Sequence, residues 1–440
     1  MNDVAAAAPL VVRALQAWYG GDPYARATGL YSYDDPALAV RRPNWHDRSG
    51  AGRNLGNGLL AAAGLRSRVQ VRSRWWNSAN AITAVIGYMA VTGDRSYTGP
   101  VVANTFARAP GTRRPVYRNP VSFARPHLRL DRYQGFRNGF YDDEGWWALA
   151  WMAAYDLTGD ERYLAAAGDI FGDMAGGWDD FLGGGIYWGK CDGAPDRDGA
   201  VAVPRGWAGG YKNAIANELF IAVAAGLALR CRHGDAAGAG HGDHLRWALR
   251  GWEWFSSPPP RGIAMINQAA LVNDSPSPSG VNDNTRSIWS YNQGVILGAL
   301  CDLGELTGDD GYVGWAGRIA DAFTRNPCRA SARPPASGVI DRILHEHNDC
   351  RPDGSALPGP PSVDGTLFKG IFVRNLARLY RSTPKAAYRD YLLRNAGSAL
   401  AYANEQFQFG CNWAAPVDVA DFVRQTAALD LVNAALLVSA

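Results

Sequence analysis

The sequence predicts an all-α fold, an (α/α)6 toroid in which six inner helices alternate with six outer helices. Two observations predict it. Twelve segments with the apolar spacing of a helix follow one another along the 440 residues, apolar on nearly every face in one segment and on one face in the next. Three inner segments also end in the same tripeptide, Thr-Gly-Asp, at 92–94, 158–160 and 307–309. Such an internal repeat indicates stacked helical hairpins.

The inner helices are predicted where apolar residues cover nearly the whole helix, because such a helix belongs inside. One inner segment is an exception, since it carries Lys369, Arg374 and Arg378. The predicted inner helices span 78–91, 145–157, 214–229, 289–304, 366–380 and 423–438. The outer helices, which have one apolar face, are predicted at 4–18, 97–108, 161–175, 243–256, 312–325 and 386–404.

The ring is expected to close on itself. An open helical solenoid needs polar caps at its ends, whereas the last inner segment, 423–438, stays apolar along its length. We therefore expect this segment to pack against the first helix pair, and we treat residues 1–440 as a single domain. The long segments that enter the inner helices then gather at one end of the ring, where loops on a rigid scaffold usually build a binding cleft. These segments are 19–74, 109–142, 176–212, 257–288 and 326–365.

The composition describes a globular protein, with 47% apolar and 19% charged residues. The formal net charge of +3 is small for this length and gives no electrostatic reason to expect nucleic acid or a membrane surface as a partner. No apolar run reaches membrane-spanning length without interruption, and the first residues lack the basic start of a signal peptide. We expect a soluble monomer, extracellular if a leader was removed and otherwise cytoplasmic.

The six cysteines show no metal-binding spacing. Cys328 and Cys350 flank a proline-rich segment, so that a disulfide between them is one alternative and two free thiols the other. Cys301 lies in an apolar segment and is expected to be a buried thiol. The histidines between 233 and 244 lie in a glycine-rich stretch that we interpret as a surface loop. No metal ion and no cofactor is expected.

The most informative motif is the pair Asp142-Asp143, which stands just before Trp146-Trp147 at the start of an apolar segment. One interpretation is structural, because aspartate caps the first turn of a helix. The other is catalytic, because a pair of carboxylates does the chemistry in most glycosidases. Adjacent aspartates also occur at 179–180 and 309–310 without tryptophans after them, so the pair alone does not decide.

The other entrances to inner helices are rich in aromatic, amide and charged residues. Aromatic faces and amide groups together suit a ligand with many hydroxyl groups, bound by stacking and hydrogen bonds. Each residue also has a structural interpretation: a tryptophan in the core, an asparagine at a helix start, or a lysine that neutralises a carboxylate. The candidate substrate-binding residues are Trp76, Asn77, Tyr141, Trp147, Trp188, Asn217, Asp283, Tyr291, Asn292, Asp364 and Lys369.

The motifs resemble those of glycoside hydrolase family 76, the endo-α-1,6-mannanases. The chain has WWNSANAI at 75–82, YDDEGWW at 141–147 and GGGIYW at 183–188, followed by NEL, WSYNQG, FKGIF and a closing FGCNW, in the order of that family. The resemblance runs from about Trp75 to Trp413. It implies an (α/α)6 barrel that cleaves α-1,6-linked mannan or mannooligosaccharides internally and with retention at the anomeric carbon.

The resemblance also implies roles for the aspartate pair. Asp142 corresponds to the nucleophile that forms a mannosyl-enzyme intermediate, and Asp143 to the general acid and base. The positive amino end of a helix lowers the pKa of a nearby carboxylate, which suits the nucleophile better than the acid.

Three other functions stay open. A transglycosylase would pass the same covalent intermediate to a sugar hydroxyl group instead of water. A sugar epimerase or isomerase on an α-helical toroid would need histidines at the mouths of inner helices, and only His345 and His347 lie in a late loop. A mannan-binding module without catalysis is the third alternative, against which the intact aspartate pair argues.

Overall fold

A computed structural model shows how the chain folds. The structure describes residues 2–20, 28–31, 75–111, 113–115, 130–132, 135–190, 212–231, 238–276, 287–329, 335–349 and 364–439. The fold is almost entirely helical, which confirms the predicted all-α class.

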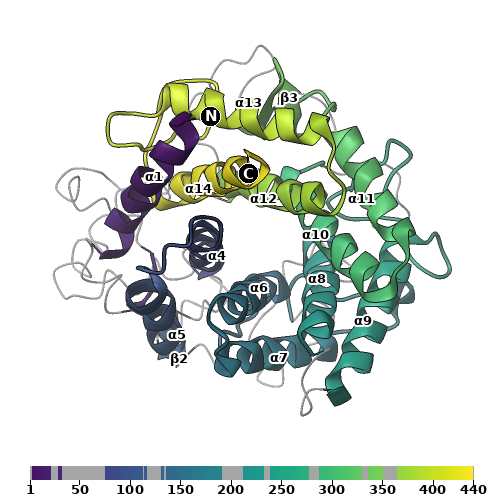
Figure 1. The fold of residues 1–440 in the computed structure, drawn as a ribbon. Helices are drawn as coiled ribbons and strands as arrows, with labels where there is room; N and C mark the ends of the chain where they lie inside the picture. The colour runs from purple at the N-terminus through teal and green to yellow at the C-terminus, as the bar shows by residue number, and fades with distance from the viewer. Residues whose placement is uncertain are drawn as a thin grey trace, which may run out of the picture.

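Six helices form the inner ring (Figure 1): α4 (Trp75–Thr92), α6 (Tyr141–Thr158), α8 (Ala214–Cys231), α10 (Ser290–Thr307), α12 (Gly365–Ser382) and α14 (Phe422–Ser439). Each packs against the next in chain order, and α14 packs against α4. The predicted inner helices are all present, and the ring is closed as expected.

The outer helices lie around this ring (Figure 1). They are α1 (Asn2–Gly20), α5 (Asn104–Arg108), α7 (Glu161–Gly176), α9 (Gly238–Ser256), α11 (Asp310–Phe323) and α13 (Ala386–Tyr402). Short helical turns η3 (Thr98–Ala103), η4 (Ala109–Gly111) and η6 (Phe181–Gly183) accompany them.

Two predictions about the outer helices were wrong. The segment 97–108 is no continuous α-helix, because Pro100 has no amide hydrogen to donate and the amide of Val102 bonds to the carbonyl of Tyr97 in a π-type turn, η3. The glycine-rich stretch before 243 is no loop throughout, because α9 already begins at Gly238. The ring of His244, in the second turn of α9, packs edge-on against Phe171 of α7, 5.3 Å between centroids, which ties this end of α9 to α7.

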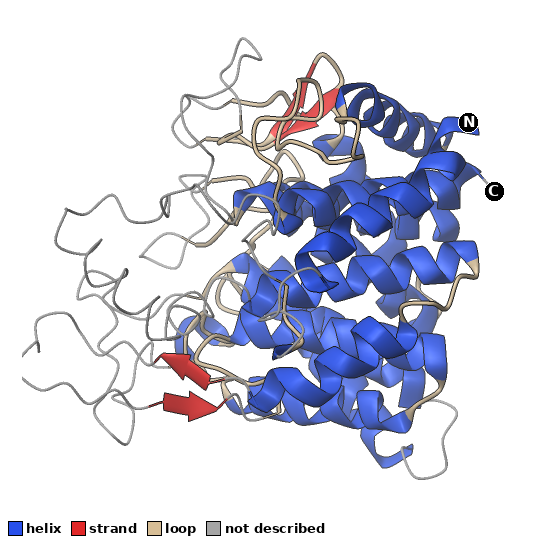
Figure 2. Cartoon of the chain, turned by 90° about the vertical axis from the view of Figure 1, so that its left-hand side faces the viewer, coloured by secondary structure: helices blue, strands red, loops and turns tan. Residues whose placement is uncertain are grey.

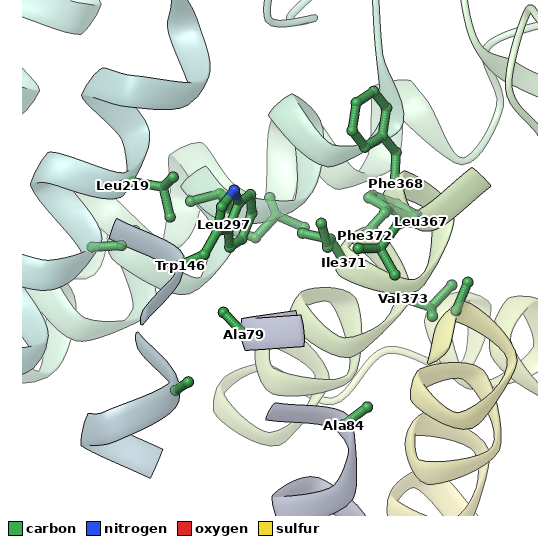
Figure 3. Packing of buried hydrophobic residues seen from close by; sticks show 14 of the residues in the cluster. Ala79, Ala84, Trp146, Leu219, Leu297, Leu367, Phe368, Ile371, Phe372 and Val373 are labelled. Carbon is green, nitrogen blue, oxygen red and sulfur yellow. The ribbon is translucent and has the colours of Figure 1, made fainter. Parts of the chain in front are cut away.

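The inner helices approach one another closely through glycines. A Cβ atom on Gly294 of α10 would lie 2.7 Å from the Cα atom of Phe372 in α12, so this crossing admits no side chain. Gly370 of α12 meets the Cα atom of Ala427 in α14 in the same way, at 2.6 Å. Figure 3 shows the apolar interior that results, with Trp146, Leu219, Leu297 and Ile371 contributed by four inner helices.

The two ends of the ring differ (Figure 2). At one end the chain passes from inner to outer helix through the Thr-Gly-Asp turns, where Gly93, Gly159 and Gly308 take left-handed φ angles of 78°, 70° and 71°. Asp160 and Asp309 then accept hydrogen bonds from the first turns of α7 and α11. The other end carries two small antiparallel sheets, β1 (Arg113–Pro115) with β2 (Leu130–Arg132) and β3 (Gly338–Ile340) with β4 (Ile343–His345), and loops that lead into inner helices.

One helix of the described chain, α8, is long and apolar enough to cross a membrane, and 89% of it is buried inside the protein. That degree of burial is typical of a core helix.

Candidate active site

The aspartate pair is positioned by a short backbone pairing. The amide of Tyr141 donates to the carbonyl of Trp188 at 3.0 Å, and the amide of Lys190 donates to the carbonyl of Gly139 at 3.1 Å. This antiparallel contact holds the segment after the glycine run against the residues that lead into α6. It brings the exposed side chain of Trp188 next to Asp142.

Asp142 and Asp143 lie in the first turn of α6, and each carboxylate has defined partners. Asp142 Oδ2 accepts from the indole Nε1 of Trp188 at 2.9 Å, and its Oδ1 accepts from the amide of Asp143 at 2.9 Å. Asp143 Oδ2 accepts from Asn138 Nδ2 at 2.6 Å. The residue at the N-cap is Phe140, which supplies no side-chain cap. Asp142 therefore satisfies one free amide of the helix while its other oxygen lies against an exposed tryptophan.

Burial raises the pKa of Asp142 to about 6, and the charge of Asp364 at the start of α12 acts in the same direction. The hydrogen bonds from Trp188 and from the amide of Asp143 lower the pKa, but by less. The expectation that the helix amino end would lower the pKa of a carboxylate here was wrong for Asp142, because the loss of water on burial outweighs the hydrogen bonds that Asp142 accepts at the helix start. Asp142 consequently titrates in the pH range in which an enzyme works.

A buried ion pair lies behind the aspartates. Glu144 is fully buried, pairs with Lys190 and accepts from the amide of Asn138 at 2.7 Å. Burial raises the pKa of Glu144 well above its ordinary value, and the charge of Lys190 opposes this. Sequence reasoning missed Glu144 and Asn138, although Glu144 stands next to the pair it supports.

Asn217, predicted to bind substrate, holds the Trp188 loop in place. Its Oδ1 accepts from the amide of Ile186 at 2.8 Å, and its Nδ2 donates to the carbonyls of Ile186 and Asn213 at 2.9 and 2.8 Å. Lys212 acts nearby, since its buried ammonium donates to the carbonyls of Phe181 and Gly184, both at 2.7 Å. The loop that carries Trp188 is thus fixed from the start of α8.

Aromatic side chains from four inner-helix entrances form a continuous series that we call the aromatic arc: Trp146, Trp76, Phe368, Trp289 and Tyr291. The ring centroids of Trp76 lie 6.1 Å from Trp146 and 6.2 Å from Phe368, and Tyr291 stacks on Phe368 at 3.7 Å. Trp289 meets Phe368 edge-on at 5.3 Å. Trp76, Trp289 and Tyr291 are partly exposed. The predicted residues Trp76 and Tyr291 are therefore brought together, and the arc reaches α6 four residues after Asp142.

Several predicted residues lie below the surface. Trp147 is fully buried between Trp75 and Phe136, each with its ring centroid 4.9 Å away. Asn77 is buried in α4, and Tyr141 is 7% exposed. Trp147 is therefore a core residue, which is the structural interpretation that the sequence left open.

Lys369 neutralises a buried carboxylate, which is the structural interpretation that the sequence left open. It is fully buried, and its Nζ lies 2.7 Å from Asp349 Oδ2.

The remaining candidates lie at the entrances to α10 and α12. Asn292 is buried, and its Nδ2 donates to Asp274 Oδ1 at 3.3 Å. Asp364 is exposed at the start of α12. Asp283 lies outside the described residues; its neighbour in the same loop, Asp274, is partly exposed and was missed. Cys301 is buried as expected, whereas Cys350, the proposed disulfide partner of Cys328, lies outside the described residues.

The described residues contain no group of three or more His, Cys, Asp or Glu side chains that could hold a metal ion.

Carboxylates beside flat aromatic faces, at the mouth of a helical toroid, are what a glycoside hydrolase of the (α/α)6 class presents to a sugar chain. The chain belongs to glycosyl hydrolase family 76, whose sequence profile matches residues 61–440.

Curated relatives are fungal. The chain is 27% identical over 263 residues to the mannan endo-1,6-alpha-mannosidase DCW1 of Saccharomyces cerevisiae, covering 56% of this chain and 47% of the relative. It is 26% identical over 287 residues to the mannan endo-1,6-alpha-mannosidase DFG5 of the same yeast, covering 62% and 54%. The chain thus spans about half the length of the curated relatives it matches.

Solved structures share the fold over nearly the whole chain. An inactive variant of the α-1,6-mannanase GH76A of Salegentibacter sp. HEL1_6, with two consecutive aspartates replaced and α-1,6-mannotetrose bound, gives a TM-score of 0.67 at 18% identity and 99% coverage of both chains. Dfg5 from Chaetomium thermophilum in complex with glucosamine gives 0.63 at 17% identity, covering 100% of this chain and 92% of that one. Both confirm the toroid.

Proposed function

We propose that this protein is a retaining endo-α-1,6-mannanase acting on mannan or mannooligosaccharides. The observation that carries the proposal is Asp142 in the first turn of α6, held by Trp188 and adjoining Asp143. The relatives named as mannan endo-1,6-alpha-mannosidases and the mannanase inactivated at two consecutive aspartates support it. The partly exposed members of the aromatic arc, Trp76, Trp289 and Tyr291, supply with Trp188 the apolar faces for successive sugar rings, and the buried Trp146 and Phe368 support them.

The reaction proceeds in two displacements. Asp142 attacks the anomeric carbon as the glycosidic bond to the leaving oxygen breaks, and Asp143 transfers its proton to that oxygen. Asp143, now ionised, takes a proton from water, which attacks the anomeric carbon and releases Asp142. Retention follows because the carbon is inverted twice. No metal or cofactor takes part in these steps.

The direct test is incubation of the protein with linear and with branched α-1,6-mannan, with product sizes followed over time. Oligosaccharides appearing early from the linear polymer are the expected result of internal cleavage. Mannose alone would point to attack at chain ends, and no release from either polymer would overturn the proposal. NMR of the first product gives the anomeric configuration and so tests retention.

The pH profile tests the role of Asp142. A nucleophile must be ionised, so kcat/KM should fall as the pH drops below about 6, the pKa of Asp142 in the free protein. Trp188→Phe removes the indole N–H that lowers this pKa, and the acidic limb should then move to higher pH. The measurement is kcat/KM of both proteins from pH 4 to 9.

Tyr187→Phe is the matched control for Trp188→Phe. Its hydroxyl belongs to the same loop but donates to Asp179 Oδ2 at 2.7 Å rather than to Asp142. The acidic limb should stay in place in this variant. If kcat/KM instead fell as the pH rose above about 6, Asp142 would have to be protonated for activity. Asp142 would then be the general acid and Asp143 the nucleophile.

Transfer to a sugar hydroxyl group is the second candidate, because the same intermediate serves both reactions. Longer products formed when acceptor mannooligosaccharide is added would favour it. An epimerase is disfavoured by His347, whose pKa burial lowers to about 4, and by His345, which is bound to Asp349. We further propose a soluble monomer with one catalytic domain over residues 1–440; sedimentation of the purified chain tests the monomer.

A further inference from the structure

A buried carboxyl group, Glu346, lies directly behind the start of α10. It is fully buried and forms hydrogen bonds with the hydroxyl groups of Ser290 and Ser337. The backbone amide of Ser290 also points to it, 3.5 Å from Oε2. Because the N-cap residue of α10, Trp289, supplies no side-chain cap, Glu346 takes that place from a distant loop.

Ser290 stands between two members of the aromatic arc. Trp289 precedes it and Tyr291 follows it, so the position of the Ser290 backbone sets where both rings lie. Trp289 also packs against His347, with the ring centroids 3.9 Å apart and the rings tilted by 43°, and the amide of His347 donates to Ser337 Oγ at 3.2 Å. Glu346 thus links Ser290 to the loop that supports the Trp289 ring from behind.

The loop that carries Glu346 is itself anchored to two further helices. The amide of Glu346 donates to Asp349 Oδ2 at 3.0 Å, and Asp349 is paired with Lys369 of α12. The amide of Leu344 donates to Asn395 Oδ1 of α13 at 2.8 Å. Because these contacts hold the Glu346 loop against α12 and α13, the carboxyl group can fix the first turn of α10 relative to those two helices.

We propose that Glu346 is a positioning residue, which fixes the first turn of α10 through Ser290 and thereby holds Trp289 and Tyr291 in the sugar-binding wall of the cleft. The role in sugar binding rests on the function proposed above, whereas the role in holding the two aromatic rings does not.

Burial, rather than the charges around it, favours the neutral form of Glu346. Burial raises the pKa of Glu346 to about 8, against the hydrogen bonds from the two serines. The groups that face it are Asp349 and the two histidines of its own segment, Lys369 from α12 and Tyr391 from α13. Asp349 adds a negative charge, Lys369 a positive one, and His347 is neutral because burial lowers its pKa to about 4.

The experiment compares Glu346→Gln with Glu346→Ala in the full chain. Glutamine keeps one donor and one acceptor, as the neutral acid does, so KM for α-1,6-mannotetraose and the near-ultraviolet circular dichroism of the tryptophans should stay close to wild type. Alanine removes the contacts with both serines, and KM should rise about tenfold with kcat changed far less. Its near-ultraviolet spectrum should change as Trp289 loosens.

Two further variants serve as controls for this comparison. Ser290→Ala removes one hydrogen bond, leaves the carboxyl group in place and should raise KM to an intermediate value, even if Glu346→Ala fails to fold. Asp302→Asn breaks an ion pair between the buried Asp302 and the exposed Arg378, toward the other end of α10. This variant should lower the melting temperature and leave KM unchanged. It therefore distinguishes a general loss of stability from a displacement of Trp289 and Tyr291.

The pH dependence of the melting temperature gives a readout without any sugar. A carboxyl group whose pKa is raised in the folded state adds stability below pH 4.5, and that stability is lost as the pH rises through 8. The wild type should therefore lose stability relative to Glu346→Gln over this range. Parallel curves, equal damage by glutamine and alanine, or wild-type KM and spectrum in Glu346→Ala would each overturn the proposal. Failure of mannan turnover in the wild type would instead refute the proposed function.

Discussion

Asp142→Asn and Asp143→Asn are each expected to lower kcat for α-1,6-mannan by about 10³-fold or more while the protein stays folded. Asparagine has nearly the same shape as aspartate but can neither attack the anomeric carbon nor exchange a proton with the leaving oxygen. Release of reducing ends measures the loss, and far-ultraviolet circular dichroism with the melting temperature checks the fold.

The chain supplies a matched control for this pair. Asp309 and Asp310 are also adjacent and also start a helix, α11, but they follow a Thr-Gly-Asp turn at the opposite end of the ring. Asp310 is exposed, and Asp310→Asn should leave kcat unchanged. Near-normal activity in Asp142→Asn or Asp143→Asn would refute the catalytic assignment.

Lys369→Met is expected to lower the free energy of unfolding by about 3–5 kcal/mol, the cost of leaving a buried charge without its partner. The ammonium pairs with Asp349, donates to the carbonyl of Cys411 and lies over the ring of Trp413. Burial opposes ionisation of Asp349, but Lys369 and His345 hold the pKa of Asp349 at about 2. Lys369→Met removes the largest of the effects that keep Asp349 ionised, so the buried carboxylate must either stay charged without its partner or take up a proton, and the folded state loses the ion pair in both cases. Urea denaturation gives the change.

An exposed pair provides the comparison for Lys369→Met. Lys385 and Asp321 lie 3.0 Å apart with side chains 40% and 36% exposed. Lys385→Met should cost less than about 1 kcal/mol, because water screens such a pair. The double variant Lys369→Met with Asp349→Asn should recover part of the lost stability. Similar losses in Lys369→Met and Lys385→Met would contradict the assignment of a buried, strongly coupled pair.

The helices could be predicted because their signals are local. An inner segment such as 214–229 is apolar on nearly every face, and the Thr-Gly-Asp turns mark the helix ends by glycine conformation and aspartate caps. Pro100 is equally evident in the sequence, but the prediction of one continuous helix over 97–108 did not take its missing amide hydrogen into account.

The site could be predicted only in part, because its contacts join distant residues. Asp142 stood out by its neighbours in sequence, but the indole of Trp188 that binds it is 46 residues away. Trp147 and Lys369 are residue types that suit a sugar-binding cleft, and only the packing shows that both are buried in the core. Glu346 gave no signal at all, because its partner Ser290 lies 56 residues earlier.

The unequal ends of the ring have a consequence for diversification of such proteins. The Thr-Gly-Asp turns are short and bound to helix starts, so an insertion there would break caps and shift helix against helix. The long entry segments carry Trp188, Asp274 and Glu346 outside the helices of the ring. Exchange of one entry segment between relatives, with contacts to the helices such as Asp349–Lys369 and Glu346–Ser290 kept, should therefore change which branched or linear glycan is accepted while the helical ring keeps its stability.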